Sequence, residues 1–197
     1  MTNLARVLDV AGGTKEGEVD VLDLPALRIP LLRLRPHLSS IHTLALESLA
    51  EQAPAVSFVH DFPGTVHTDL HKDTPGWLGW FSRMVHEIVY ALLGRWLFVP
   101  IDECGDRHVY LATNGRYKPK DGDAVGIKFT DGVNAAKGTD GVEGSGVYSL
   151  DWDCEGSTKK SIEVLDGLRK KGTREIVWNH ITEEFERVAG TSVYNRG

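Results

Sequence analysis

The segment from residue 60 to residue 71 concentrates side chains that could transfer protons or bind a metal ion. Its polar residues are His60, Asp61, His67, Asp69 and His71. In an extended chain alternate residues share a face, so the spacing of the last three could bring their side chains together. A metal centre normally adds a fourth ligand and supporting hydrogen bonds, which this sequence does not indicate, so we expect a solvated loop and no metal site. An imidazole titrates near neutral pH, which makes His60 and His67 the candidates for acid–base catalysis.

The two cysteines, Cys104 and Cys154, lie far apart in the sequence and form no C-x-x-C motif. The usual zinc and dithiol redox motifs are therefore missing. Two thiols in a chain of 197 residues fit a reducing compartment. The first residues, Met-Thr-Asn-Leu-Ala-Arg, lack the basic and apolar regions of a signal peptide, so we expect a cytoplasmic location.

The composition is that of a globular protein, with 41% hydrophobic and 25% charged residues. Lys and Arg number 22 against 28 Asp and Glu, which gives a formal net charge of -6. A protein that binds a phosphate backbone needs a concentrated basic face, and this balance points the other way. We therefore expect no nucleic-acid partner.

Apolar periodicity and turn residues predict an alternation of strands and helices. The predicted strands cover residues 5–10, 56–60 and 146–151, and the predicted helices cover residues 38–52, 77–97, 102–113, 161–171 and 174–189. A helix that feeds a strand through one short loop is typical of a βαβ unit, which implies a parallel sheet. The sequence thus predicts one α/β domain over residues 1–197, with about three parallel strands of a partial doubly wound (Rossmann-like) sheet and flanking helices. Residues 114–145, rich in Gly, Asp and Lys, are predicted to form a surface excursion, and residues 158–190 a helical C-terminal extension.

The most apolar stretch runs from Trp77 to Leu97 and carries large side chains on one broad helical face. Its charged residues make it too polar for a membrane-spanning helix, so we expect no spanning segment. A core-facing helix is the favoured interpretation, and a helix lying on a membrane surface is the alternative. The tryptophans could also line a pocket for an apolar ligand.

A strand followed by Pro-Gly-x-Val-x-Thr occurs at residues 56–68. In an open parallel sheet, ligands bind beyond the carboxyl ends of the strands. Pro63 fixes the exit of the chain, Gly64 allows backbone to approach a ligand, and Thr68 offers a hydroxyl.

With this motif the sequence resembles the short-chain dehydrogenase/reductase family, and more narrowly fungal reductase-like proteins of natural-product pathways. The segments Thr43–Ala50, Gly105–Thr113 and Gly144–Asp151 look like the family's central helix, the helix that leads to its last strand, and that strand. The resemblance implies an oxidoreductase of a secondary-metabolite pathway, with NADP or NAD as cofactor and a bulky apolar carbonyl compound or alcohol as substrate. It assigns cofactor contact to four positions. These are Pro63, Gly64, Val66 and Thr68.

Two parts of the family pattern are missing. The glycine-rich TGxxxGxG turn does not occur, and the Gly-rich segment Ala11–Gly17 breaks the Walker pattern, so we interpret it as a plain turn. Placing the central helix by Leu49 and Ala50 puts Arg35 and Ser39 where the family's Tyr-x-x-x-Lys pair stands. The pair supplies a phenol whose proton reaches the carbonyl oxygen as hydride arrives, and neither replacement can do this. The sequence therefore predicts that this chain, alone, is impaired in or lacks reductase activity, and no catalytic residue is carried over.

Two other functions fit the residues. A pocket His60 or His67 could serve a cofactor-independent isomerase, cyclase or dehydratase, and the chain could also be a non-catalytic partner or a truncated pseudoenzyme. In each interpretation the strand Ala5–Val10 exposes an apolar edge that proteins usually cover. We therefore expect a homodimer or another partner at this edge.

Overall fold

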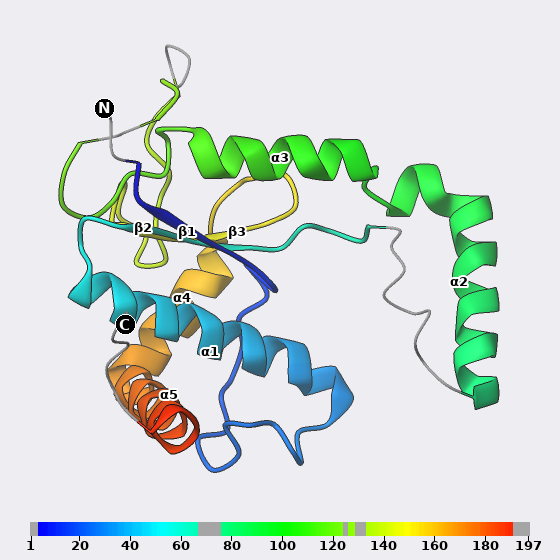
Figure 1. Cartoon of the computed structure of the whole chain (residues 1–197), viewed down its shortest axis with the longest axis horizontal. Coiled ribbons are helices and arrows are strands. Elements are labelled where there is room, and N and C mark those ends of the chain that lie inside the picture. Colours follow the sequence, from blue (N-terminus) through cyan, green and yellow to red (C-terminus); the bar gives the residue numbers. More distant parts are fainter. Residues whose placement is uncertain (1–3, 67–75, 124–125, 129–132, 191–197) are drawn as a thin grey trace. The chain divides into compact units, whose positions relative to one another are not determined.

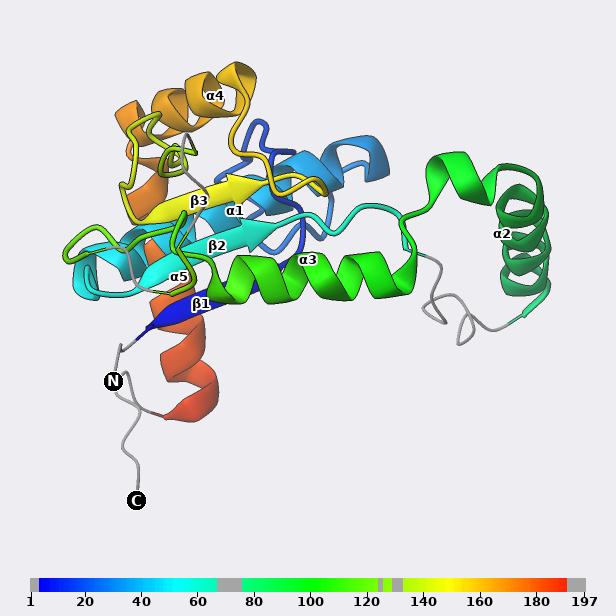
Figure 2. The ribbon, with the colours of Figure 1, turned by 90° about the horizontal axis from the view of Figure 1, so that it is seen from above.

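The computed structural model describes residues 4–66, 76–123, 126–128 and 133–190. Three strands form one parallel sheet in the order β1-β2-β3 (Figures 1 and 2). They are β1 (Arg6–Val10), β2 (Ser57–Asp61) and β3 (Val147–Leu150). The helices are α1 (Leu31–Gln52), α2 (Gly76–Leu97), α3 (Ile101–Thr113), α4 (Lys159–Lys170) and α5 (Thr173–Ala189). The expected α/β class, with three parallel strands and flanking helices, is confirmed.

The chain forms two compact units, Met1–Phe62 with Leu111–Gly197, and Pro63–Tyr110. The first unit holds the sheet, and α1, α4 and α5 lie on one side of it (Figure 1). On that face, Phe58 and Val147 pack with Leu46 and Ala50 of α1. The side chains of alternate strand residues point to the other face. There they form a second core of buried residues: Val59, Leu111, Tyr117, Ala136, Tyr148, Leu150 and Cys154.

Helix α1 begins at Leu31, well before the predicted start at residue 38. The apolar stripe behind the prediction begins at Ile41, and the leucines that open the helix, Leu31 and Leu32, are exposed and lie outside it. Pro36 is the sixth residue of the helix and has no backbone N–H, so it forgoes the hydrogen bond that this position would otherwise donate to the carbonyl of Leu32. The first turn is closed instead by the carbonyl of Pro30, which accepts from the amides of Arg33 and Leu34.

The segment 114–145 differs from the predicted surface excursion, because two of its side chains are in the core. Tyr117 and Ala136 are buried, and the Tyr117 hydroxyl donates to the carbonyl of Cys154 at 2.8 Å. The backbone carbonyl of Tyr117 accepts from the side chains of Arg6 and Ser57. Single anchors of this kind leave no apolar period in the sequence, which explains the difference.

In the second unit, aromatic side chains of α2 pack against Phe98. The rings of His86 and Tyr90 meet Phe98 edge-on, at centroid distances of 5.3 and 5.2 Å. Trp77 and Trp96 are 74% and 80% exposed, so the favoured core-facing interpretation does not hold for these side chains. Among the residues described, each helix is too short or too polar to cross a membrane.

Candidate functional site

A row of polar side chains crosses the sheet near its carboxyl edge. The register pairs Asp9 of β1 with His60 of β2, and His60 with Ser149 of β3. Each of these residues lies two positions after an apolar residue on the same strand, and alternate residues share a face. The side chains of this row therefore point to the face of the sheet that α1 covers. They lie nearer the carboxyl ends of the strands than Phe58 and Val147, which pack against α1 on the same face.

His60 is fully buried and both of its ring nitrogens are hydrogen-bonded. The amide of Gly12 donates to Nε2 at 2.9 Å, so this nitrogen must be an acceptor and the neutral ring carries its proton on Nδ1. Nδ1 lies 2.8 Å from Oγ1 of Thr43 and donates to it. Burial lowers the pKa of His60 to about 4, so the ring is neutral at pH 7.

Two hydrogen-bond chains meet at the carboxyl group of Glu16. Its Oε1 accepts from the Thr43 hydroxyl at 2.9 Å, which continues the chain from His60. The same oxygen accepts from the Ser149 hydroxyl at 2.5 Å, and Ser149 in turn accepts from the amide of Thr14. Glu16 is buried, and its Oε2 has no hydrogen-bond partner among the described residues. The carboxyl group thus ties the loop after β1 to β3 and α1.

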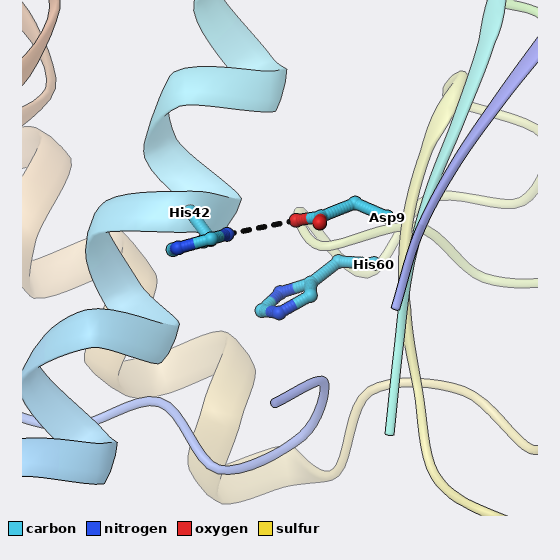
Figure 3. A group of neighbouring side chains, drawn as sticks. All are labelled: Asp9, His42 and His60. Carbon is cyan, nitrogen blue, oxygen red and sulfur yellow. Dashed lines mark hydrogen bonds and ion pairs between the residues drawn. The ribbon is translucent and has the colours of Figure 1, made fainter. Parts of the chain in front are cut away.

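His42 of α1 is half-exposed and faces Asp9 (Figure 3). Its Nδ1 lies 2.9 Å from Oδ2 of Asp9, and this hydrogen bond raises the pKa of His42 and lowers that of Asp9. The rings of His42 and His60 stack at 5.7 Å. One potential ligand atom from each of these three residues lies within 4.8 Å of the others. A metal ion bound there by all three would cost His60 one of its two buried hydrogen bonds.

Phe62 follows β2 directly and stands at the carboxyl edge of the sheet. Its amide donates to the carbonyl of Leu150 at 3.0 Å, which fixes its position. The guanidinium carbon of Arg35 lies 4.1 Å from the centre of its ring, and the Lys15 ammonium lies 5.0 Å from it. Lys15 also forms an ion pair of 2.7 Å with Asp151. Two cations from different elements therefore meet at one aromatic ring.

The Pro-Gly motif is found at the start of the second unit. Gly64 has a φ of 82°, a left-handed conformation that suits glycine. The carbonyl of Thr65 accepts from the amide of Val99 at 2.8 Å, and Val66 forms a parallel bridge with Val99. His67 and Thr68, together with Asp69 and His71, lie outside the described residues. Cofactor contact at Pro63, Gly64 and Val66 stays a prediction, as does an acid–base role for His60 or His67.

Comparison with curated proteins finds fungal relatives. The chain is 31% identical over 178 residues to "Oxidoreductase AN1596" of Emericella nidulans, an alignment that covers 89% of this chain and 52% of that protein. It is 29% identical over 181 residues to "Oxidoreductase andH" of Emericella variicolor, covering 90% and 50% of the two chains. It is 32% identical over 190 residues to "NmrA-like family domain-containing oxidoreductase notO" of an Aspergillus species, covering 93% and 50%. The chain is related to fungal proteins named oxidoreductases.

These relatives agree with the expected resemblance to oxidoreductases. Their names do not specify the short-chain dehydrogenase/reductase family. The chain spans about half the length of the curated relatives it matches. No protein-family model matches it. No solved structure matches it either.

If the chain binds a dinucleotide, the glycine-rich turn after β1 is the place where its pyrophosphate would be expected. A Cβ atom on Gly13 would lie 2.3 Å from the carbonyl oxygen of Leu150 and 2.4 Å from that of His60, so this glycine is required by packing. The amides on either side of it donate to the side chains of His60 and Ser149. A pyrophosphate cradle needs free amides at the start of a helix, and α1 begins well after this turn. The turn does not fit a pyrophosphate, in agreement with its interpretation as a plain turn.

Sequence reasoning found His60 but missed its partners. Asp9, Glu16, Thr43 and Ser149 belong to four separate segments, and no local motif joins them. His42 adjoins Thr43 on α1, at the edge of the predicted apolar stripe. The usable signal was strand register, but it needs the correct strand ends. Aligning the last residues of β1, β2 and β3 places Asp9, His60 and Ser149 in one row, whereas the predicted ends at residues 10, 60 and 151 do not.

Proposed function

We propose that this chain is a short-chain dehydrogenase/reductase-like oxidoreductase of a secondary-metabolite pathway. Its substrate would be a bulky apolar carbonyl compound or alcohol, and by itself the chain would be impaired in hydride transfer. The observation that carries the proposal is the parallel sheet with a polar carboxyl edge, in a chain related to fungal proteins named oxidoreductases. Ligands of open parallel sheets bind at this edge.

The proposed impairment has a physical basis in this chain. Ser39 is buried in α1, and its backbone carbonyl lies 3.0 Å from the Thr43 hydroxyl. Arg35 is held against Phe62. Neither side chain can donate a proton to a carbonyl oxygen near neutral pH as a phenol can. The turn after β1 also offers no cradle for a pyrophosphate, so we assign the remaining contact with NADP or NAD to Pro63, Gly64, Val66 and Thr68.

Titration with NADPH and NADH, followed by nicotinamide fluorescence, tests this proposal. We expect saturable binding with a Kd between about 0.1 and 1 mM, roughly 4 to 5.5 kcal/mol, because the strongest anchor is missing. We also expect no reduction of bulky apolar ketones. Thr68→Val should weaken binding several-fold, whereas Thr65→Val, a matched change three residues earlier in the sequence, should not. Absence of saturable binding would overturn the oxidoreductase assignment, and turnover of a ketone would overturn the impairment.

We also propose that β1 pairs with β1 of a second copy. β1 is the outer strand of the sheet, and it contains no proline, lysine or bulge that would protect its edge. Arg6 points inward and binds the carbonyls of Leu111 and Tyr117, so it does not guard the edge. Val7 and Val10 are 41% and 49% exposed. A two-fold axis beside β1 would pair the two edges in antiparallel fashion.

Sedimentation equilibrium checks this dimer. We expect the chain to dimerise at concentrations of about 10 to 100 μM, and Val7→Lys to weaken the dimer at least about ten-fold by placing a charge beside the pairing edge. Val188→Lys, on the exposed side of α5, is the control and should leave the dimer unchanged. A folded wild-type monomer across this range would contradict the proposal.

A further inference from the structure

The carboxyl edge of the sheet carries a positive site built on Phe62. The ring is anchored by the backbone bond to Leu150, and it receives Arg35 from α1 and Lys15 from the loop after β1. Both cations lie within the distance at which an aromatic face attracts a charge. Two like charges on one ring repel each other, so the arrangement is stabilised when an anion is present.

The two cations differ in what balances their charge. The Lys15 ammonium is paired with Asp151 at 2.7 Å. Arg35 is exposed, and within the described ranges no carboxylate lies at ion-pair distance from it. Arg33, two residues earlier on the same helix, is paired with Glu18 at 2.7 Å. The site over Phe62 therefore keeps one uncompensated positive charge, on the guanidinium.

The backbone of α1 adds to the positive electrostatic potential around Arg35. Arg35 stands close to the N-terminus of α1, a helix of 22 residues. The first turn contains no acidic residue, and no side chain caps it. The first turn itself thus supplies no acidic side chain to balance the partial positive charge of the helix N-terminus. A guanidinium presents a planar fork of donors that matches a carboxylate in two parallel hydrogen bonds.

We propose that Arg35, Phe62 and Lys15 form a binding site for the carboxylate of an apolar organic acid. The carboxylate would bind the Arg35 fork, and the hydrocarbon part would pack against the exposed part of Phe62. This inference deepens the proposed function, on which it rests, by giving the bulky apolar substrate an acidic group. It does not depend on the nicotinamide cofactor for its test.

Isothermal titration of the full chain with 2-naphthoate, without any nucleotide, tests the site. We expect 2-naphthoate to bind at least about ten-fold more tightly than methyl 2-naphthoate, which has the same rings and no charge. Binding of 2-naphthoate should weaken on raising NaCl from about 50 to about 500 mM, because an exposed ion pair is screened. Inorganic phosphate should compete only weakly, since it lacks the apolar part. If phosphate bound the site as tightly as 2-naphthoate does, the assignment to an organic acid would be overturned.

Three variants separate this site from general charge effects. Arg35→Gln should reduce the affinity for 2-naphthoate about ten-fold, and Arg35→Lys should lose less because it keeps the charge without the fork. Arg33→Gln removes the same charge from the same helix and should leave affinity unchanged. Equal binding of acid and ester, or equal loss of affinity in the Arg33 and Arg35 variants, would overturn the proposal.

If Arg35→Gln fails to fold, the acid–ester and salt comparisons on the wild-type chain still decide whether the site binds an organic acid. Failure of NADPH binding alone would count against the proposed function and leave this site standing.

Discussion

Replacing Glu16 with alanine is expected to lower the free energy of unfolding by about 3 kcal/mol. The substitution leaves the Ser149 hydroxyl buried without its acceptor and removes one of the two acceptors of the Thr43 hydroxyl, which keeps the carbonyl of Ser39 at 3.0 Å. Each buried donor that loses its partner costs about 1–3 kcal/mol. The loss also releases the loop after β1 from both β3 and α1, because the two hydrogen-bond chains end on this one carboxyl group.

Urea denaturation at neutral pH measures the effect. Glu16→Gln keeps one acceptor oxygen and should cost only about 1 kcal/mol. Glu18→Ala is the matched control in the same loop, and it removes only an exposed ion pair with Arg33, so we expect a change below about 0.5 kcal/mol. A Glu16→Ala chain as stable as the wild type would show that the hydrogen-bond chains do not support the fold.

Acidification is expected to destabilise the chain through His60. Burial lowers the pKa of His60 from 6.5 to about 4, so the unfolded chain binds a proton that the folded chain refuses. The stabilisation from neutral His60 is complete above the unfolded pKa and is lost as the pH falls toward the folded pKa. At about pH 4.5 the loss amounts to roughly 2.5 kcal/mol.

The neighbouring Asp9–His42 pair has the opposite effect on the free energy of unfolding, which it lowers as the pH rises. The pKa of His42 is raised by its hydrogen bond to Asp9, so its contribution is present below its unfolded pKa and is lost as the pH rises through the folded pKa. Urea denaturation at several values between about pH 4.5 and about pH 8 separates the two groups. His60→Asn should remove most of the acid-side slope at the cost of lower stability at pH 7, whereas Asp9→Asn should mainly reduce the slope on the alkaline side. An unchanged acid-side slope in His60→Asn would contradict the assignment.

The fold class could be predicted because each strand and helix carries a local signal. Val56–His60 is a compact apolar run, and the helices 161–171 and 174–189 show apolar spacing of three and four residues. In the structure β2, α4 and α5 lie within two residues of these bounds. The burial of Tyr117 could not be predicted, because one aromatic residue in a polar segment forms no period.

The site could be predicted only in part, because its chemistry depends on pairing between distant segments. His60 stood out as a histidine at the end of a strand. Its properties are set by Gly12, Thr43 and Glu16, which reach it through the turn after β1 and through α1. Because His60 is buried and both of its ring nitrogens have hydrogen-bond partners, its ring is neutral at pH 7. From the sequence alone, a histidine is expected to titrate near neutral pH.

The packing of Gly13 bears on how such chains change during evolution. Two main-chain oxygens from neighbouring strand ends leave no room for any side chain there. Natural selection for a stable fold would therefore keep a glycine at this turn in a descendant that had abandoned nucleotides altogether. A glycine at this turn is thus a mark of how tightly the strand ends close, and its presence is not by itself a sign of phosphate binding.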